Sequence, residues 1–132
     1  MPPQTNHSYY NFDPVMFTLF DKAGTTYLRY HYSFGGAVTD EAVLACLKWS
    51  GIADAQQKLN DGQFPIRLRL THGRQSLHFT LRRMDSHGYL KGVVVLKYFG
   101  FVPVGGNRAN IRRVSFHNFL RDLKSALHNN QA

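Results

Sequence analysis

Two short stretches of alternating residues decide the fold of this chain: Ile66-Arg67-Leu68-Arg69-Leu70 and Leu77-His78-Phe79-Thr80-Leu81. Alternation of apolar and polar residues is typical of a β-strand with one buried face. Gly73-Arg74 between them fits a two-residue hairpin loop with glycine in the first position. That loop predicts the register, in which Leu70 faces Leu77, Leu68 faces Phe79 and Ile66 faces Leu81. A slip of one residue would expose every apolar side chain of the hairpin, so the register is well specified.

The polar side of this hairpin is the first candidate binding surface. The register places Arg69 opposite His78 and Arg67 opposite Thr80, with Arg82 further along the second strand. Arginine pairs with phosphate through forked hydrogen bonds and also stacks on bases. We expect Arg29 and His31, from an earlier strand, to extend the surface, and an aromatic residue such as Tyr27 to offer a stacking platform. A solvated outer sheet face explains the same residues equally well.

Other segments are predicted to add strands to this hairpin. Val15–Phe20 and Thr25–Phe34 are joined across a turn at Gly24 and read as a pair of strands. Tyr89–Phe99 reads as a further strand, and the valines at 93 and 95 suggest that it is covered on both faces. Residues 100–104 and 111–114 are expected to be short extended pieces on either side of a loop.

Helical signals appear in mid-chain and at the C-terminus. Thr39 can cap a helix whose first turn holds Asp40 and Glu41, and apolar spacing through Val43, Cys46 and Leu47 continues it to Gly51. Residues 52–59 suggest a second short helix. Ser115 can cap the last helix, in which one apolar stripe follows helical spacing: Phe116, Phe119, Leu120, Leu123 and Leu127.

These elements predict a single α+β domain at residues 9–132 behind a flexible leader at residues 1–8. The expected sheet is mainly antiparallel with about six strands, accompanied by one mid-chain helix and a C-terminal amphipathic helix packed on it. A chain of 132 residues is long enough for one hydrophobic core. The element order over residues 63–128, four strands closed by a helix, is similar to that of PUR-repeat and Whirly-type single-strand-binding folds, without shared motif residues.

The expected loop Gly105-Gly106-Asn107-Arg108 and the strand after it form a second candidate binding surface. Glycine lets the backbone approach a phosphate closely, and Arg108, Arg112 and Arg113 would supply positive charge. The spacing matches neither the P-loop nor the dinucleotide-binding fingerprint. An ordinary hairpin loop is the alternative interpretation.

Positive charge is concentrated in the second half of the chain. Residues 62–132 contain twelve Lys or Arg against two Asp, a net charge of +10, whereas residues 1–61 contain four against six, a net charge of −2. Such a field attracts polyanions, of which nucleic acid is the commonest. We therefore predict a nucleic-acid-binding protein that is not an enzyme. Single-stranded DNA or RNA is favoured, because no predicted helix carries a basic face with base-reading residues.

Three alternative functions remain open from sequence. The first is an interaction module for an acidic protein partner, with a homodimer formed through an open strand edge. The second is a metal-free ribonuclease in which His31 or His78, converging across a sheet, acts with Arg67 or Arg69. The third is a small-ligand domain whose cavity would be lined by aromatic residues: Tyr30, Tyr32, Phe34 and Trp49.

Metal, cofactor and membrane functions find no support in the sequence. The seven histidines lack zinc-site spacing, no nucleophile motif is present, and Cys46 stands alone in an apolar helical pattern. The longest apolar run, at residues 92–96, is far below the roughly 20 residues that span a membrane. The first residues lack the layout of a signal peptide, so we expect a cytoplasmic protein.

Overall fold

Two antiparallel sheets and two α-helices make up this α+β protein, whose computed structural model describes residues 7–32 and 38–130. The first sheet, sheet A, has the order β1 (His7–Asn11), β2 (Val15–Lys22), β3 (Thr25–Tyr32) and β4 (Val38–Val43). The second, sheet B, has the order β5 (Lys48–Ser50), β6 (Ile66–His72), β7 (Gln75–Met84), β8 (Tyr89–Tyr98) and β9 (Val102–Arg112). The single sheet of about six strands was therefore wrong, although the fold class is confirmed.

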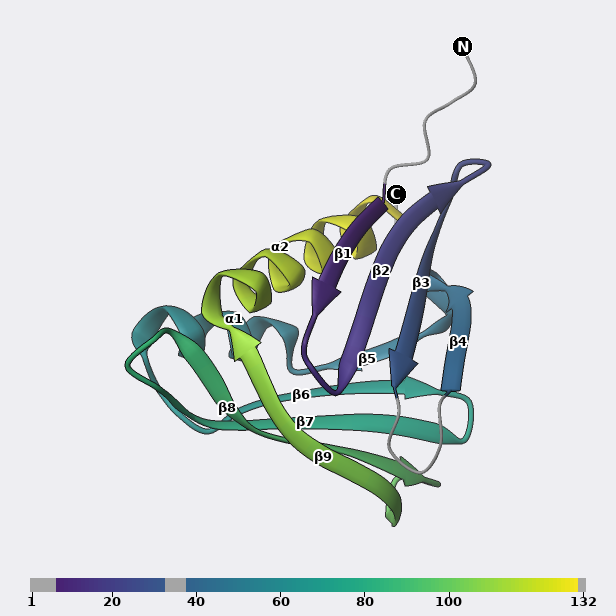
Figure 1. Ribbon diagram of the computed structural model, residues 1–132. Helices are drawn as coiled ribbons and strands as arrows, with labels where there is room; N and C mark the ends of the chain where they lie inside the picture. The colour runs from purple at the N-terminus through teal and green to yellow at the C-terminus, as the bar shows by residue number, and fades with distance from the viewer. Residues whose placement is uncertain (1–6, 33–37, 131–132) are drawn as a thin grey trace.

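The helices lie on the same side of sheet B as sheet A does (Figure 1). Helix α1 (Ile52–Asp61) follows β5 and packs on β6, and helix α2 (Arg113–Asn130) closes the chain beside β1. In Figure 1 the strands of sheet A run steeply across those of sheet B. The opposite side of sheet B, its outer face, is covered by none of the described elements.

The predicted hairpin register is confirmed. In β6 and β7, Leu70 pairs with Leu77, Leu68 with Phe79 and Ile66 with Leu81. All six side chains are buried. Gly73 has a φ of 61° in the connecting turn, a backbone conformation that glycine adopts without strain.

The helix predicted from Thr39 to Gly51 was wrong, because residues 38–43 form edge strand β4. Thr39 pairs with His31 and Glu41 with Arg29, whose side chains form an ion pair at 2.8 Å. A 3₁₀ turn at Leu44–Cys46 and the short strand β5 follow, so Cys46 is exposed instead of lying in an apolar helix. Gly51 does not end a helix: with φ 95° it precedes α1, which confirms the expected helix over residues 52–59.

Three boundaries also differ from the predictions. His7 and Ser8 belong to β1 and are not part of a leader, and residues 1–6 lie outside the described part. Residues 102–112 form one long strand, β9, instead of two short pieces around a loop. Helix α2 begins at Arg113, so Ser115 lies inside its first turn.

Phe119 of α2 is the centre of a core shared by both sheets. Its ring stacks on Phe17 of β2 at 4.9 Å and meets the edges of Tyr10, Phe12 and Trp49 at 4.9 to 5.8 Å. The four apolar residues expected at the start of the helical stripe, from 116 to 123, are fully buried, which confirms its orientation.

Three of the four aromatic residues considered as the lining of a small-ligand cavity pack in the core. Tyr30 and Tyr32 are 2% exposed, and Trp49 lies against Phe17. Phe34 lies outside the described residues. Burial and the nearby Asp122, which accepts a hydrogen bond from Tyr10, raise the pKa of the Tyr10 phenol to about 12.

Candidate nucleic-acid interface

The outer face of sheet B begins with the polar side of the predicted hairpin. Arg69 lies opposite His78 and Arg67 opposite Thr80, as the register required. The two arginines are exposed, whereas the alternate residues of the same strands are buried. The strict alternation in β6 and β7 therefore turns apolar side chains to the core and basic ones to the outside.

Strands β8 and β9 extend this face. Thr80 pairs with Val93, which in turn pairs with Arg108, and Arg83 pairs with Lys91 beyond a bulge at residues 81–83. Val93 and Val95 are half-buried on the outer side, so the prediction that β8 is covered on both faces was wrong. The hairpin arginines and the pair Arg108 and Arg112, inferred from sequence as separate surfaces, therefore belong to one face.

We call this surface the basic face. It consists of the outward side chains of β6 to β9 and the bulge residue Arg82. Its Lys, Arg and His residues are Arg67, Arg69, His78, Arg82, Arg83, Lys91, Lys97, Arg108 and Arg112. The five strands of sheet B contain nine Lys or Arg, one in β5 and two in each of the others, and no Asp or Glu. Strands of sheet A, by contrast, contain Asp21, Asp40 and Glu41.

The arginines of the basic face have no carboxylate partner. In the part of the chain that the structure describes, none of the six forms an ion pair: Arg67, Arg69, Arg82, Arg83, Arg108 and Arg112. Arg83 even lies directly across from Lys91, and like charges in this arrangement destabilise a sheet. Cations held together without counter-charges create a strong local site for anions.

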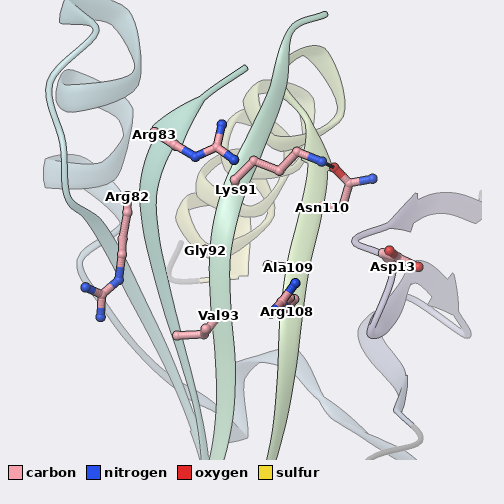
Figure 2. Close-up of a pocket in the computed structure, with 9 residues that line it drawn as sticks. All are labelled: Asp13, Arg82, Arg83, Lys91, Gly92, Val93, Arg108, Ala109 and Asn110. Atoms are coloured by element: carbon pink, nitrogen blue, oxygen red, sulfur yellow. Dashed lines mark hydrogen bonds between the residues drawn. The ribbon is translucent and has the colours of Figure 1, made fainter. Parts of the chain in front are cut away.

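A groove of about 510 Å³ crosses the basic face between β7 and β9 (Figure 2). Figure 2 shows Arg83 directed toward Lys91, whose ammonium donates to Oδ1 of Asn110, while Arg82 points away from them. Arg108 stands between Val93 and the β1–β2 loop, which brings Asp13 to the edge of the groove. This central groove can accept an anionic group from several directions.

A smaller groove of about 280 Å³ lies beside the start of α1. Arg67, Arg69 and His78 line one side, and Gly51 and Asp54 of the α1 start line the other. A Cβ atom at Gly51 would come within 2.8 Å of the Arg67 carbonyl oxygen, so glycine lets the helix start approach β6. The two grooves make the basic face continuous from β6 to β9.

His78 adds a neutral polar group to this face. Burial lowers the pKa of its imidazole, and the charges of Lys97 and Arg69 lower it further. Nε2 of His78 lies 2.8 Å from the Ser76 hydroxyl. At pH 7 the imidazole is therefore uncharged, and it serves as a hydrogen-bonding group beside the arginines.

Among the described residues, the carboxylates near the basic face come from its surroundings: Asp13 and Asp54 border the two grooves, and Asp85 lies in the β7–β8 turn. Asp85, in the β7–β8 turn, accepts hydrogen bonds from the backbone N–H groups of Tyr89 and His87, and these bonds hold its pKa below the ordinary value. Its other oxygen is 3.7 Å from the Lys91 ammonium. Asp85 thus acts as a turn residue at the rim.

Several predicted site residues lie elsewhere. Arg113, at the start of α2, donates to the Leu59 carbonyl oxygen of α1. Arg29 and Tyr27 belong to sheet A, where the Arg29 guanidinium lies 5.0 Å from the Phe20 ring centroid and Tyr27 stacks on the same ring. They do not extend the basic face, because β3 belongs to the other sheet.

The histidine pair considered for RNA cleavage is also separated. His31 belongs to β3 and contacts Thr39, whereas His78 belongs to β7 in sheet B, so the two do not converge across one sheet. Among residues 7–32 and 38–130, no three His, Cys, Asp or Glu side chains gather in a way that could hold a metal ion.

Sequence reasoning missed four polar residues of the basic face: Arg83, Lys91, Lys97 and Asn110. Alternate residues of a strand lie on one face, so Lys91 and Lys97 lie on the same face of β8 as Val93 and Val95. Assigning the two valines to the outer face would have identified the two lysines. Tyr89 also faces outward, where Arg112 donates to its hydroxyl at 3.2 Å and Lys91 lies over its ring.

Comparison with known proteins assigns no family: no protein-family model matches the chain, and no curated protein is detectably similar to it. Neither helix of the described chain is long and apolar enough to cross a membrane. Function must therefore be argued from the basic face itself.

Proposed function

We propose that this protein binds nucleic acid through the basic face without catalysing a reaction, and that it favours single-stranded DNA or RNA. One observation carries the proposal: five adjacent strands hold nine Lys or Arg and no Asp or Glu. Their outward side chains share one face that no described element covers. Arginine predominates there, and its planar fork suits phosphate oxygens.

The shape of the face supports a single strand over a duplex. From β6 to β9 it spans three inter-strand gaps, about 14 Å in all, at the usual spacing of about 4.8 Å. The major groove of B-DNA is only about 12 Å wide and admits a helix or a two-stranded ribbon. Helix α2 offers only two exposed Lys or Arg side chains in the described chain, Lys124 and Arg121, and Arg121 is paired with Asp122. A flexible single strand can follow the broad sheet surface.

Affinity measured across a salt series tests the proposal. Fluorescence anisotropy with labelled single-stranded DNA, single-stranded RNA and duplex DNA should show tightest binding to a single strand. The logarithm of the affinity should fall with that of salt by about 0.7 per phosphate neutralised on a single strand. The double variant Arg67→Gln, Arg69→Gln should reduce this slope by about 1.4, since it removes two contacts.

Arg121→Gln is the matched control, because this exposed arginine lies on α2 away from the basic face. Its slope should equal that of the wild type. No binding to any of the three ligands at low salt would refute the proposal and leave an acidic protein as the candidate partner. A slope reduced by about 0.7 in the control, half the change in the double variant, would show that only net charge matters. A cytoplasmic location is part of this proposal.

A further inference from the structure

We propose that a pocket at the end of sheet B, separate from the two grooves, binds one unpaired nucleobase of the strand that lies on the basic face. This inference rests on the proposed function. The pocket has a volume of about 460 Å³ and lies between the β6–β7 turn, the β8–β9 turn and β4; the residues that matter are Asp40, His72, Arg74, Gln75, Tyr98 and Phe99. Its size is in the range of small-molecule sites.

The two turns are joined into one wall of the pocket. The backbone N–H of Phe99 donates to the Arg74 carbonyl oxygen at 2.8 Å, and Gln75 pairs with Tyr98 across the strands. On the far side the Tyr30 hydroxyl lies 2.9 Å from Nδ1 of His72 and donates to Asp40. The walls are therefore set before a ligand arrives.

Phe99 supplies a flat apolar surface at the mouth of this pocket. Its side chain is 63% exposed, and its φ is 57°, in the left-handed region that disfavours bulky residues. With Gly100, whose φ is 81°, it forms a tight turn in which Asn or Gly would be the favoured first residue. Neither burial nor turn geometry explains a phenylalanine here, whereas stacking on a base requires an exposed ring.

Gln75 belongs to the fixed wall of the pocket. Its side-chain amide N–H donates to the Tyr98 hydroxyl at 3.4 Å, and its Oε1 is closed to solvent. The contact that the pocket offers a base is therefore the exposed ring of Phe99.

The pocket lies on the side of sheet B that faces sheet A, because His72, Gln75 and Tyr98 share a face with the buried Leu70, Leu77 and Leu96. A strand on the basic face therefore enters the pocket by turning round the end of sheet B. Lys97 of the basic face directly precedes Tyr98 in β8, and Arg74 adds a cation at the mouth. Five residues of β8 separate Val93, in the central groove, from Tyr98, a distance of about 17 Å along the strand. A strand of a few nucleotides covers that distance and the turn round the sheet end, where Lys97 and Arg74 lie beside its phosphates.

The test compares a cytidine oligonucleotide with an abasic oligonucleotide of the same length, which keeps the phosphates and lacks the bases. Wild-type protein should bind the cytidine strand about 5- to 150-fold more tightly, the range for one stacked base. Phe99→Gly should lose most of this factor and bind the abasic strand as the wild type does. Its melting temperature should rise, because glycine relieves the positive φ, so the loss cannot come from unfolding.

Phe101→Ala is the matched control, because Phe101 is 74% exposed in the same turn but does not line the pocket. This variant should bind both strands as the wild type does. Equal affinity of the wild type for the cytidine and abasic strands would refute base binding in the pocket and leave the proposed role of the basic face standing. Equal loss of affinity for the cytidine strand in the two variants would refute it in the same way. Failure to bind even the abasic strand at low salt would instead refute the proposed function and the pocket together.

Discussion

Removing an arginine from the basic face should make the protein more stable while weakening its binding. Arg83 is the best position, because it is exposed, lies directly opposite Lys91 and forms no ion pair in the described chain. Opposed like charges on neighbouring strands cost about 0.2–1 kcal/mol. Arg83→Gln removes that repulsion and keeps most of the side-chain length.

The expected change in melting temperature follows from chain length. Unfolding 132 residues carries an entropy of about 0.28 kcal/mol/K at about 2.1 cal/mol/K per residue. A gain of 0.2–1 kcal/mol therefore raises the melting temperature by about 1–4 °C. The gain should shrink in 1 M salt, where the screening length falls to about 3 Å.

Arg29→Gln is the opposing control. Arg29 forms an ion pair with Glu41 at 2.8 Å and lies over the ring of Phe20, so its loss should lower the melting temperature by about 1–5 °C. Calorimetry at low and high salt measures both variants, and anisotropy measures strand binding, which only Arg83→Gln should weaken. A clear fall in the melting temperature of Arg83→Gln would refute the reasoning, because Arg83 would then have a stabilising partner.

Three further predictions concern stability. Gly92→Ala should lower the free energy of unfolding by about 3 kcal/mol or more in urea titration, because its Cβ would lie 1.9 Å from the Thr80 carbonyl oxygen. A decrease of less than about 1 kcal/mol would mean that β7 and β8 can move apart at Gly92. Leu123→Asp should abolish cooperative melting, since the side chain is fully buried. A normal melting curve would show that the apolar side of α2 is not part of the hydrophobic core. Because the pKa of His78 is lowered in the folded protein, the unfolded chain binds a proton at higher pH than the folded one, and the free energy of unfolding falls as the pH drops below about 6.5. The free energy of unfolding of His78→Gln should fall less than that of the wild type between pH 7.5 and 5.5, and an equal fall would contradict this.

Local pattern was sufficient for the central hairpin and for α2. In β6 and β7 the alternation and the glycine turn depend on neighbouring residues alone, so the register could be read directly. Residues 38–43 show the limit of such reasoning. Thr39, Asp40 and Glu41 resemble a helix start, but the segment pairs with β3, and the ion pair between Arg29 and Glu41 joins residues far apart in sequence.

The candidate site was predictable in its composition and only partly in its geometry. The arginines of the hairpin were found, but their union with Arg108 depends on the pairing of β8 with β9. This pairing was not predicted, because the two glycines Gly105-Gly106 indicated a loop instead of a strand. In the structure Gly106 permits close approach, since a Cβ there would lie 2.9 Å from the Val94 carbonyl oxygen. Tertiary contacts of this kind leave no periodic signal.

Strand β9 is the last strand of sheet B, and it pairs only with β8 among the described strands. Such an edge can recruit a second copy of the same strand and start aggregation, and natural sheets prevent this with charge, proline and bulges. β9 carries Pro103, Arg108, Arg112 and an irregular register near Lys97. Two copies approaching edge to edge would bring these arginines together. The charge that we propose to bind phosphates therefore also opposes edge-to-edge association of two copies, and we expect a substitution that weakens one effect to weaken the other.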